Sequence, residues 1–359
     1  MQREHIVVAG AGIVGVSIAY HLAKRGARVT IVEALNPGAG ATGKSFGWIN
    51  ATFSKRPRAY FDLNHRAMAE WRRFEMELNG RLKVRRGGSI TWFPAGPEAE
   101  ELKASVAQHQ RWGYDARLID GDELRKLAPA VDPGVWSVAC YAEEDATVEP
   151  VDAVTVLLEH AQELGVELRC PCRVTATPVP RVETNQGSIE ASTVVLACGV
   201  DLPGLARRTG FRVPLKESPG VLIHTSPQRE LIDAVIVAPE VHCKQGLDGR
   251  IVAGGPVVAG VGTATTEAAD TDQILRQLRK ILPALGDVDA ERVTLGYRVM
   301  PEDEYPILGF PTACPNVYVA AMHSGVTLAP LVGRMAATEI LDRVPVDALR
   351  PYRPDRFTS

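Results

Sequence analysis

A glycine-rich turn close to the start of the chain, Gly10-Ala11-Gly12-Ile13-Val14-Gly15, most constrains how this sequence can fold. The apolar run 6–9 before it is rich in β-branched residues, which is typical of a buried parallel strand. Residues 14–25 have the spacing of a helix, and residues 28–33 return as a second strand. Because a G-x-G-x-x-G motif between a strand and a helix marks a βαβ nucleotide fold, the turn predicts a dinucleotide-binding site.

The three glycines of the motif have separate physical tasks. Gly10 permits the tight turn, Gly12 lets a pyrophosphate approach the backbone, and Gly15 lets helix and strand pack closely. The free N–H groups and the positive end of the helix then attract the phosphates. Glu33 follows the second strand, where its carboxylate can accept hydrogen bonds from ribose hydroxyls, and it argues against NADP. The motif alone leaves FAD and NAD open.

Length and composition exclude several classes of protein. The chain has 359 residues, more than one core usually holds, so we expect two domains. A net charge of −3 and the lack of a basic run with interleaved aromatics argue against nucleic acid as a partner. No apolar stretch reaches the roughly 18 residues of a membrane helix, and no secretory signal precedes the first strand, so we expect a cytoplasmic protein. The six cysteines lack zinc spacing, so we expect no metal site and interpret them as buried or idle thiols.

The rest of the chain alternates between helical and strand-like segments. A loop of small residues over 36–50 replaces the next Rossmann helix and suits a backbone that runs along an extended ligand. The last helix is expected from about Thr327, with Pro330 in its first turn. The other expected helices are 57–78, 99–112, 122–128, 149–164 and 271–281; the expected strands are 85–93, 138–141, 166–168, 173–175, 188–190, 194–199, 221–225, 234–237, 251–254, 293–299 and 317–321.

This order predicts an α/β fold. We expect a doubly wound, Rossmann-like dinucleotide-binding domain with an inserted α+β substrate domain dominated by antiparallel strands. The expected boundaries place 1–80, 145–215 and 297–359 in the nucleotide-binding domain, and 81–144 and 216–296 in the substrate domain.

Five motifs in this order carry a family resemblance. They are the segment Gly10 to Glu33, the Gly40-to-Ser45 loop, the strand end 196–199, the segment 296–301 together with 306–309, and the segment 322–330. Together they resemble the FAD-dependent oxidoreductases of the D-amino acid oxidase superfamily, nearest to its glycine oxidase and sarcosine oxidase branch. The resemblance implies FAD rather than NAD. It also implies non-covalent binding, because no cysteine matches the attachment site of monomeric sarcosine oxidase and Cys314 lies in a proline-rich turn.

The resemblance also implies where FAD lies. The loop 42–45 would line the pyrophosphate and ribityl chain, Val174 would meet the adenine, and Gly199 would lie near the pyrophosphate. The segment 324–327 would meet the pyrimidine edge of the isoalloxazine, where the positive end of the last helix would stabilise the charge of reduced flavin. The expected cofactor-binding residues are Gly10, Gly12, Ile13, Val14, Gly15, Glu33, Thr42, Gly43, Lys44, Ser45, Val174, Gly199, Ser324, Gly325, Val326 and Thr327.

Two residues are expected to be catalytic. The resemblance implies that Arg298 grips a substrate carboxylate as a two-pronged donor and so fixes Cα against flavin N5. His323 is the best candidate for a polar group near the flavin, as a base or as a hydrogen-bonding group. Six further side chains could face the substrate, although each is interpreted as a structural or surface residue: Tyr297, Tyr305, His224, His242, Lys216 and Lys244.

The implied reaction is oxidation of an amino acid or secondary amine of the glycine, sarcosine or D-amino acid type. Hydride would pass from Cα to flavin N5, and water would hydrolyse the resulting imine. Such chemistry depends on positioning and on a stabilised reduced flavin. Oxygen or another acceptor would take the electrons. Two alternatives stay open: an FAD-dependent 2-hydroxy acid or glycerol-phosphate dehydrogenase, and the FAD subunit of a heteromeric amine dehydrogenase. The exact substrate and the oligomeric state also stay open.

Overall fold

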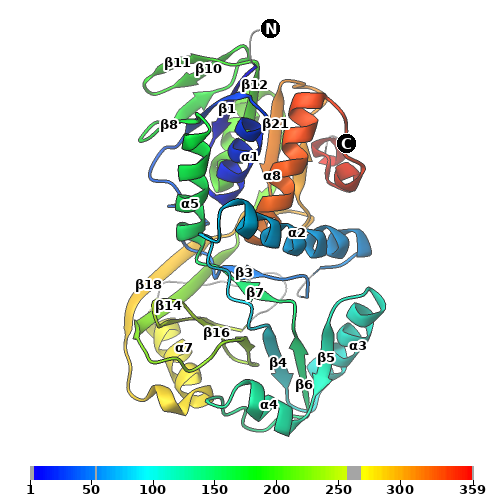
Figure 1. Cartoon of the computed structure of the whole chain (residues 1–359), viewed down its shortest axis with the longest axis vertical. Coiled ribbons are helices and arrows are strands. Elements are labelled where there is room, and N and C mark those ends of the chain that lie inside the picture. Colours follow the sequence, from blue (N-terminus) through cyan, green and yellow to red (C-terminus); the bar gives the residue numbers. More distant parts are fainter. Residues whose placement is uncertain (1–3, 53–54, 257–267, 358–359) are drawn as a thin grey trace.

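The computed structural model describes residues 4–52, 55–256 and 268–357. These residues form two large β-sheets, one toward each end of an elongated molecule, as Figure 1 shows. The chain passes between the sheets several times, so each sheet contains segments that are far apart in the sequence.

The sheet nearer both termini has six strands in the order β20-β21-β12-β1-β2-β8. Its centre is parallel, because β1 pairs in parallel with both β2 and β12, while β20 runs antiparallel to β21 at one edge. The strands are β1 His5–Ala9, β2 Arg28–Val32, β8 Glu167–Arg169, β12 Thr193–Leu196, β20 Ile307–Gly309 and β21 Val317–Ala321.

The burial of β1 explains its unbroken apolar sequence. Ile6 and Val8 belong to the core on one face of the sheet, and Val7 and Ala9 belong to the core on the other. Because successive side chains of a strand point to opposite faces, a strand covered on both faces needs an apolar residue at every position. One face is covered by α1 Ile13–Lys24, α2 Arg58–Glu77, α5 Pro150–Glu163 and α8 Gly325–Asp342; the other is covered by α6 Leu202–Thr209 and the antiparallel strands β9 Val174–Ala176, β10 Arg181–Thr184 and β11 Gly187–Glu190.

The second sheet has eight strands in the order β18-β14-β17-β16-β15-β4-β6-β5 and is antiparallel except where β15 pairs with β4. All its strands come from the two expected insertions, apart from the last residue of β18, although the exact domain boundaries stay a prediction. The strands are β4 Ser89–Phe93, β5 Ala116–Ile119, β6 Val138–Ala142, β14 Pro219–Pro227, β15 Val235–Val237, β16 His242–Gln245, β17 Arg250–Gly254 and β18 Ala290–Tyr297; the helices of this half are α3 Pro97–Arg111, α4 Gly121–Leu127 and α7 Ala268–Ile281.

Some elements differ from the sequence-based expectation. Helix α8 begins at Gly325, two residues early, so Pro330 is its sixth residue and does not lie in the first turn. Strand β18 ends at Tyr297, which leaves Arg298 just beyond it. Strand β4 begins at Ser89 rather than at residue 85. Strands β5, β10, β16 and β20 were not expected, nor were the short pairs β3 Trp48–Ile49 with β7 Ala146–Thr147 and β13 Leu215–Lys216 with β19 Met300–Pro301.

None of the described helices combines the length and apolarity that a membrane crossing requires. The described residues also include no group of three or more His, Cys, Asp or Glu side chains arranged to hold a metal ion.

Candidate active site

A cavity of about 1180 Å³ extends from the turn after β1 to the start of α8 and on to the strands of the second sheet. This volume exceeds the roughly 300–1,000 Å³ typical of pockets for small ligands. Of the expected site residues, all but Gly15 and Gly43 border the cavity. The cavity can therefore hold an extended ligand together with a second, smaller molecule.

The turn after β1 has the close approaches that the motif predicts. Gly10 has a φ of +105°, and a Cβ there would lie 2.6 Å from the Ala197 carbonyl oxygen. A Cβ on Gly15 would lie 2.1 Å from the Gly10 carbonyl oxygen, so Gly15 serves the packing of the turn and not the cavity wall. At Gly12 the nearest atom to an added Cβ is Thr42 Oγ1 at 3.2 Å. Gly12 therefore leaves bare backbone on the cavity wall.

The start of α1 is open to a ligand. No side chain caps this helix at Gly12, and its first bond within the helix runs from Val16 N to Gly12 O. Of the earlier amides, that of Ile13 donates to Thr42 Oγ1 at 3.1 Å. Helix termini of this kind attract anions, because the free N–H groups and the dipole act together.

Glu33 borders the cavity and also organises the loop around it. Its Oε2 accepts a hydrogen bond of 2.7 Å from the amide of Ala11, and its Oε1 accepts one of 2.8 Å from the amide of Leu35. The sequence-based reasoning expected ribose hydroxyls as the donors and did not foresee these two amides. Each carboxylate oxygen keeps a further lone pair, so a role toward ribose stays a prediction.

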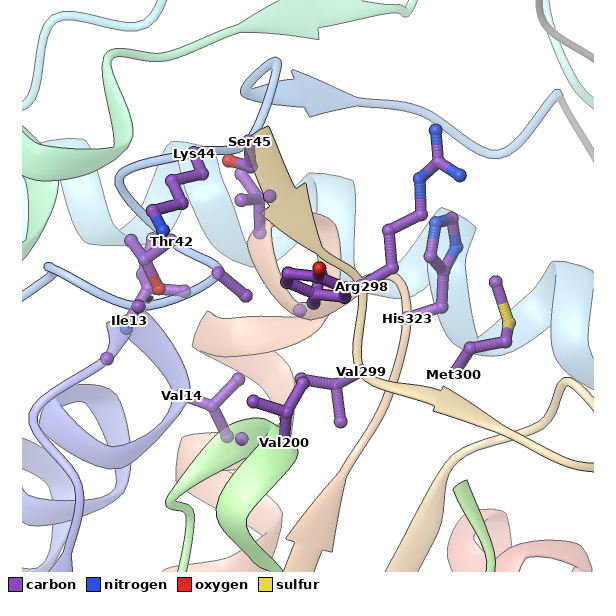
Figure 2. A pocket seen from close by; sticks show the side chains of 18 of the residues that line it. Ile13, Val14, Thr42, Lys44, Ser45, Val200, Arg298, Val299, Met300 and His323 are labelled. Carbon is purple, nitrogen blue, oxygen red and sulfur yellow. Dashed lines mark hydrogen bonds between the residues drawn. The ribbon is translucent and has the colours of Figure 1, made fainter. Parts of the chain in front are cut away.

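The loop after β2 contributes three of its four expected residues. Thr42, Lys44 and Ser45 border the cavity, and Figure 2 shows them along one of its walls. Gly43 does not border it: its amide donates to the Gly38 carbonyl at 2.7 Å, and a Cβ there would lie 2.7 Å from that same oxygen. The buried Oγ of Ser45 has no partner within the described residues. A ligand could supply one.

The start of α8 borders the cavity at residues 324–327. No side chain caps this helix, because the hydroxyl of Ser324 bonds to other side chains instead. Thr327 has a structural task that the sequence did not show: its Oγ1 donates to the Trp48 carbonyl at 3.2 Å and accepts from the Asn50 amide at 3.3 Å. Its hydroxyl therefore joins α8 to β3.

Arg298 projects into the cavity from the segment between β18 and β19. Its Nη1 donates to the Pro219 carbonyl at 3.2 Å and to Ser218 Oγ at 3.3 Å. A Cβ on Gly220 would lie 2.8 Å from Nη2, so the glycine makes room for the guanidinium. No carboxylate pairs with Arg298 among the described residues. Partial burial lowers its pKa below the usual value, yet a guanidinium of this kind remains a cation at neutral pH.

His323 lies beside Arg298, and Figure 2 shows the two side chains pointing the same way. The accessible surface of His323 faces the cavity, but protein atoms surround the ring. This desolvation and, to a smaller extent, the positive charges of Lys55 and Arg298 lower the pKa of His323 to about 3. The imidazole is therefore neutral at physiological pH and is a weak base.

Sequence reasoning missed Lys55, which also borders the cavity. The side chain is buried, and its Nζ donates to Ser324 Oγ. The Oη of Tyr60 lies 3.0 Å from the same Ser324 Oγ, and the Lys55 ammonium lies 5.3 Å from the centre of the Tyr60 ring. Burial lowers the pKa of Lys55 to about 8.

Asp145 was also missed, although it supports one wall of the cavity. It is fully buried and accepts hydrogen bonds from Trp48 Nε1 at 3.0 Å, Ser89 Oγ at 2.7 Å and Thr52 Oγ1 at 3.3 Å, and from the hydroxyl of Tyr114. Burial raises the pKa of Asp145 to about 6, against the opposing effect of these donors. The carboxylate thus holds Trp48, which borders the cavity, to the second sheet.

The further candidates divide into two groups. Tyr297 and His242 border the cavity. Burial lowers the pKa of His242 to about 4, so its ring is also neutral, with Nδ1 2.6 Å from the Gly255 carbonyl oxygen. The others do not border it: Tyr305, His224, Lys216 and Lys244.

Together, a glycine-rich turn beside an uncapped helix, a cavity that reaches both sheets and an arginine beside a neutral histidine are the features expected of a dinucleotide-dependent oxidoreductase. Residues 5–339 match the family of FAD dependent oxidoreductases, and the chain belongs to that family. The predicted fold class, with FAD as the cofactor, is thereby confirmed. The protein is accordingly an FAD-dependent amino acid or amine oxidoreductase.

Individual relatives share the whole length of the chain. Glycine oxidase of Bacillus licheniformis is 24% identical over 371 residues, which cover 99% of this chain and 98% of that protein. A hydrogen cyanide synthase subunit of Pseudomonas aeruginosa is 26% identical and covers 99% and 97%. The crystal structure of L-proline dehydrogenase from P. horikoshii matches with a TM-score of 0.89 at 25% identity and covers 99% and 98%.

The residues present fit the family's cofactor. Gly10 and Gly12 leave room for a diphosphate beside the uncapped start of α1. The hydroxyl of Ser45 is available for a ligand, and the uncapped start of α8 borders the same cavity. Both helix starts present the positive end of a dipole, which favours a ligand that carries negative charge near each of them.

Proposed function

We propose that this protein oxidises a small amino acid or secondary amine at the C–N bond next to a carboxylate. The observation that carries the proposal is Arg298, a cation without a carboxylate partner among the described residues, beside a neutral His323 on the cavity wall. Bound FAD would supply the acceptor for the hydride, with its two electrons, that leaves the carbon. The nitrogen loses a proton, and water then splits the imine into an amine or ammonia and a carbonyl compound.

The side chains would act mainly by positioning the substrate. Arg298 would bind the carboxylate through two parallel N–H donors, which fixes the carbon next to it. Since the pKa of His323 lies near 3, we assign this residue to hydrogen bonding with the neutral amine and not to proton uptake. Oriented binding of this kind can supply a large part of the rate enhancement.

An anaerobic titration of the yellow holoenzyme tests the proposal. Glycine, sarcosine, proline and D- and L-amino acids should bleach the flavin absorbance, whereas 2-hydroxy acids should not. Arg298→Met should weaken binding of a carboxylated amine by roughly 2–5 kcal/mol, as expected for truncation of one partner of a buried charge pair. Arg207→Met changes an exposed arginine of α6 and should have no such effect. Bleaching by 2-hydroxy acids or glycerol phosphates alone would contradict the proposal.

A second candidate is suggested by the relative from Pseudomonas aeruginosa, which is named a subunit of a larger enzyme. In this case the chain would be the FAD subunit of a heteromeric amine dehydrogenase. Reduced holoenzyme would then pass electrons to a dye and not to oxygen. Purification from the native cell would recover partner chains with it.

A further inference from the structure

Two positive side chains border the substrate end of the cavity, and no carboxylate pairs with either among the described residues. Within the described residues, the guanidinium of Arg298 donates to a carbonyl and a hydroxyl. Lys55 donates to the hydroxyl of Ser324, which is neutral. Both side chains lie near His323, because the positive charge of each lowers the pKa of that imidazole. This end of the cavity thus holds two fixed positive charges.

The burial of Lys55 makes its lack of a partner costly. Its side chain is 6% exposed, and a buried ammonium is poorly compensated by a hydroxyl and the face of a tyrosine ring. Asp145 is the carboxylate that acts on Lys55 electrostatically, but its oxygens accept their hydrogen bonds from four other side chains. No carboxylate of the described residues therefore forms an ion pair with the Lys55 ammonium.

The carboxylates that border the cavity either have other partners or lie away from Lys55 and Arg298. Glu304 pairs with Lys216 at 2.7 Å, and Asp201 pairs with Arg173 at 3.2 Å. Glu33 accepts from two amides at the opposite, glycine-turn end. Glu240 is exposed and forms no ion pair with a described residue. None of them forms an ion pair with Lys55 or Arg298.

We infer that Lys55 and Arg298 together bind two carboxylates of one substrate, so that the natural substrate is an amine that carries two carboxylates. This inference rests on the proposed function. A substrate with one carboxylate would neutralise Arg298 only. The ammonium of Lys55 would then be shielded from water by the bound substrate and would have no counter-charge. A dicarboxylate neutralises both cations. The dicarboxylate therefore binds more favourably, because its second carboxylate pairs with Lys55. A monocarboxylate is disfavoured because it leaves the buried charge of Lys55 unpaired.

Matched substrate pairs that differ by one carboxylate test the inference on the holoenzyme. Sarcosine against iminodiacetate places the extra carboxylate on the nitrogen side, and alanine against aspartate, in both enantiomers, places it on the carbon side. At least one pair should show a preference for the dicarboxylate of about tenfold or more in kcat/KM, which corresponds to about 1.4 kcal/mol. Lys55→Met should lower kcat/KM for the dicarboxylate about tenfold more than for the monocarboxylate, so that the preference disappears. Lys55→Arg should retain it.

The controls separate the possible failures. Lys126→Met removes an exposed lysine of α4 and should leave the preference unchanged. If Lys55→Met does not hold FAD, succinate and acetate binding to the wild-type holoenzyme, followed by flavin absorbance, replaces the variant; tighter binding of acetate would overturn the inference. Equal loss for both members of a pair, or an altered absorbance of the ligand-free flavin, would show that Lys55 serves the cofactor and would also overturn it. If no amine bleaches the flavin, the proposed function itself fails.

Discussion

The indole Nε1 of Trp71 donates a hydrogen bond of 3.1 Å to the carbonyl of Val326, the helical acceptor that Pro330 leaves without its usual donor. Proline has no N–H, so the carbonyl four residues earlier in a helix loses its partner. Trp71 is fully buried and comes from α2, more than 250 positions away in the sequence. The bond therefore stabilises the part of α8 that borders the cavity.

Trp71→Phe should lower the free energy of unfolding by roughly 1–3 kcal/mol through the unsatisfied carbonyl, and further through the lost ring volume. Urea unfolding of the FAD-free protein measures it. Pro330→Ala in the Trp71→Phe background restores an amide to Val326 and should recover part of the loss. A double variant with fully additive losses would show that the indole does not replace the missing helical bond.

Substitution by alanine should have different effects at Gly10 and at Gly12. Gly10→Ala places a Cβ 2.6 Å from a backbone oxygen at a φ of +105°, so this variant should fold poorly. In Gly12→Ala the Cβ meets a side-chain oxygen at 3.2 Å, which can shift. We expect Gly12→Ala to fold with near wild-type stability and to bind FAD at least tenfold more weakly, about 1.4 kcal/mol, because the methyl lies on the cavity wall. Denaturation without FAD and titration with FAD separate the two effects; unchanged FAD affinity would argue against a phosphate at this turn.

The sequence could predict those parts of the site whose chemistry is local. The glycine turn, Glu33 and the parallel strands depend on short-range patterns, and the resemblance added Arg298 and His323. Lys55 belongs to the run Lys55-Arg56-Pro57-Arg58, which has the composition of a solvated loop. Its burial depends on Tyr60 and on Ser324, which is 269 positions away. No local pattern encodes such a contact.

Asp145 was missed for the same reason. It ends the acidic run Glu143-Glu144-Asp145, which is typical of an exposed turn, yet it is fully buried among donors from three other segments. The start of α8 could not be predicted to the residue because Pro330 favours an early helical position. The compensating donor, Trp71, comes from another helix.

Non-covalent binding of FAD stays a prediction, and the cysteines of the cavity wall support it. Cys172 and Cys198 border the cavity. Burial raises the pKa of Cys198 to about 12, so this thiol stays protonated and is a weak nucleophile. Acid or heat denaturation should therefore release all the flavin into the supernatant, and the denatured chain should have the mass of its sequence. Yellow precipitate with the mass of an attached flavin would contradict this.

The charge of Lys55 gives the inferred dicarboxylate site a characteristic pH dependence. Burial lowers the pKa of Lys55 to about 8, so its positive charge is present below pH 8 and is lost as the pH rises above it. The groups that face it do not titrate in this window: Arg298 stays charged, His323 stays neutral, Tyr60 has a raised pKa, and Asp145, with a pKa of about 6, is already ionised. Lys55 is thus the group that changes charge between pH 7 and 9.5.

The affinity for succinate should therefore be constant from pH 7 to about 8 and then fall by up to about tenfold per pH unit, as expected for one linked proton. The affinity for acetate should stay flat, since Arg298 alone holds it. Asp145→Asn removes the negative charge that raises the pKa of Lys55, so the fall should begin at a lower pH in this variant while acetate binding stays unchanged. Flavin absorbance during titration of the holoenzyme reports both affinities. A succinate affinity that stays constant to pH 9.5 would mean that the second carboxylate does not contact Lys55.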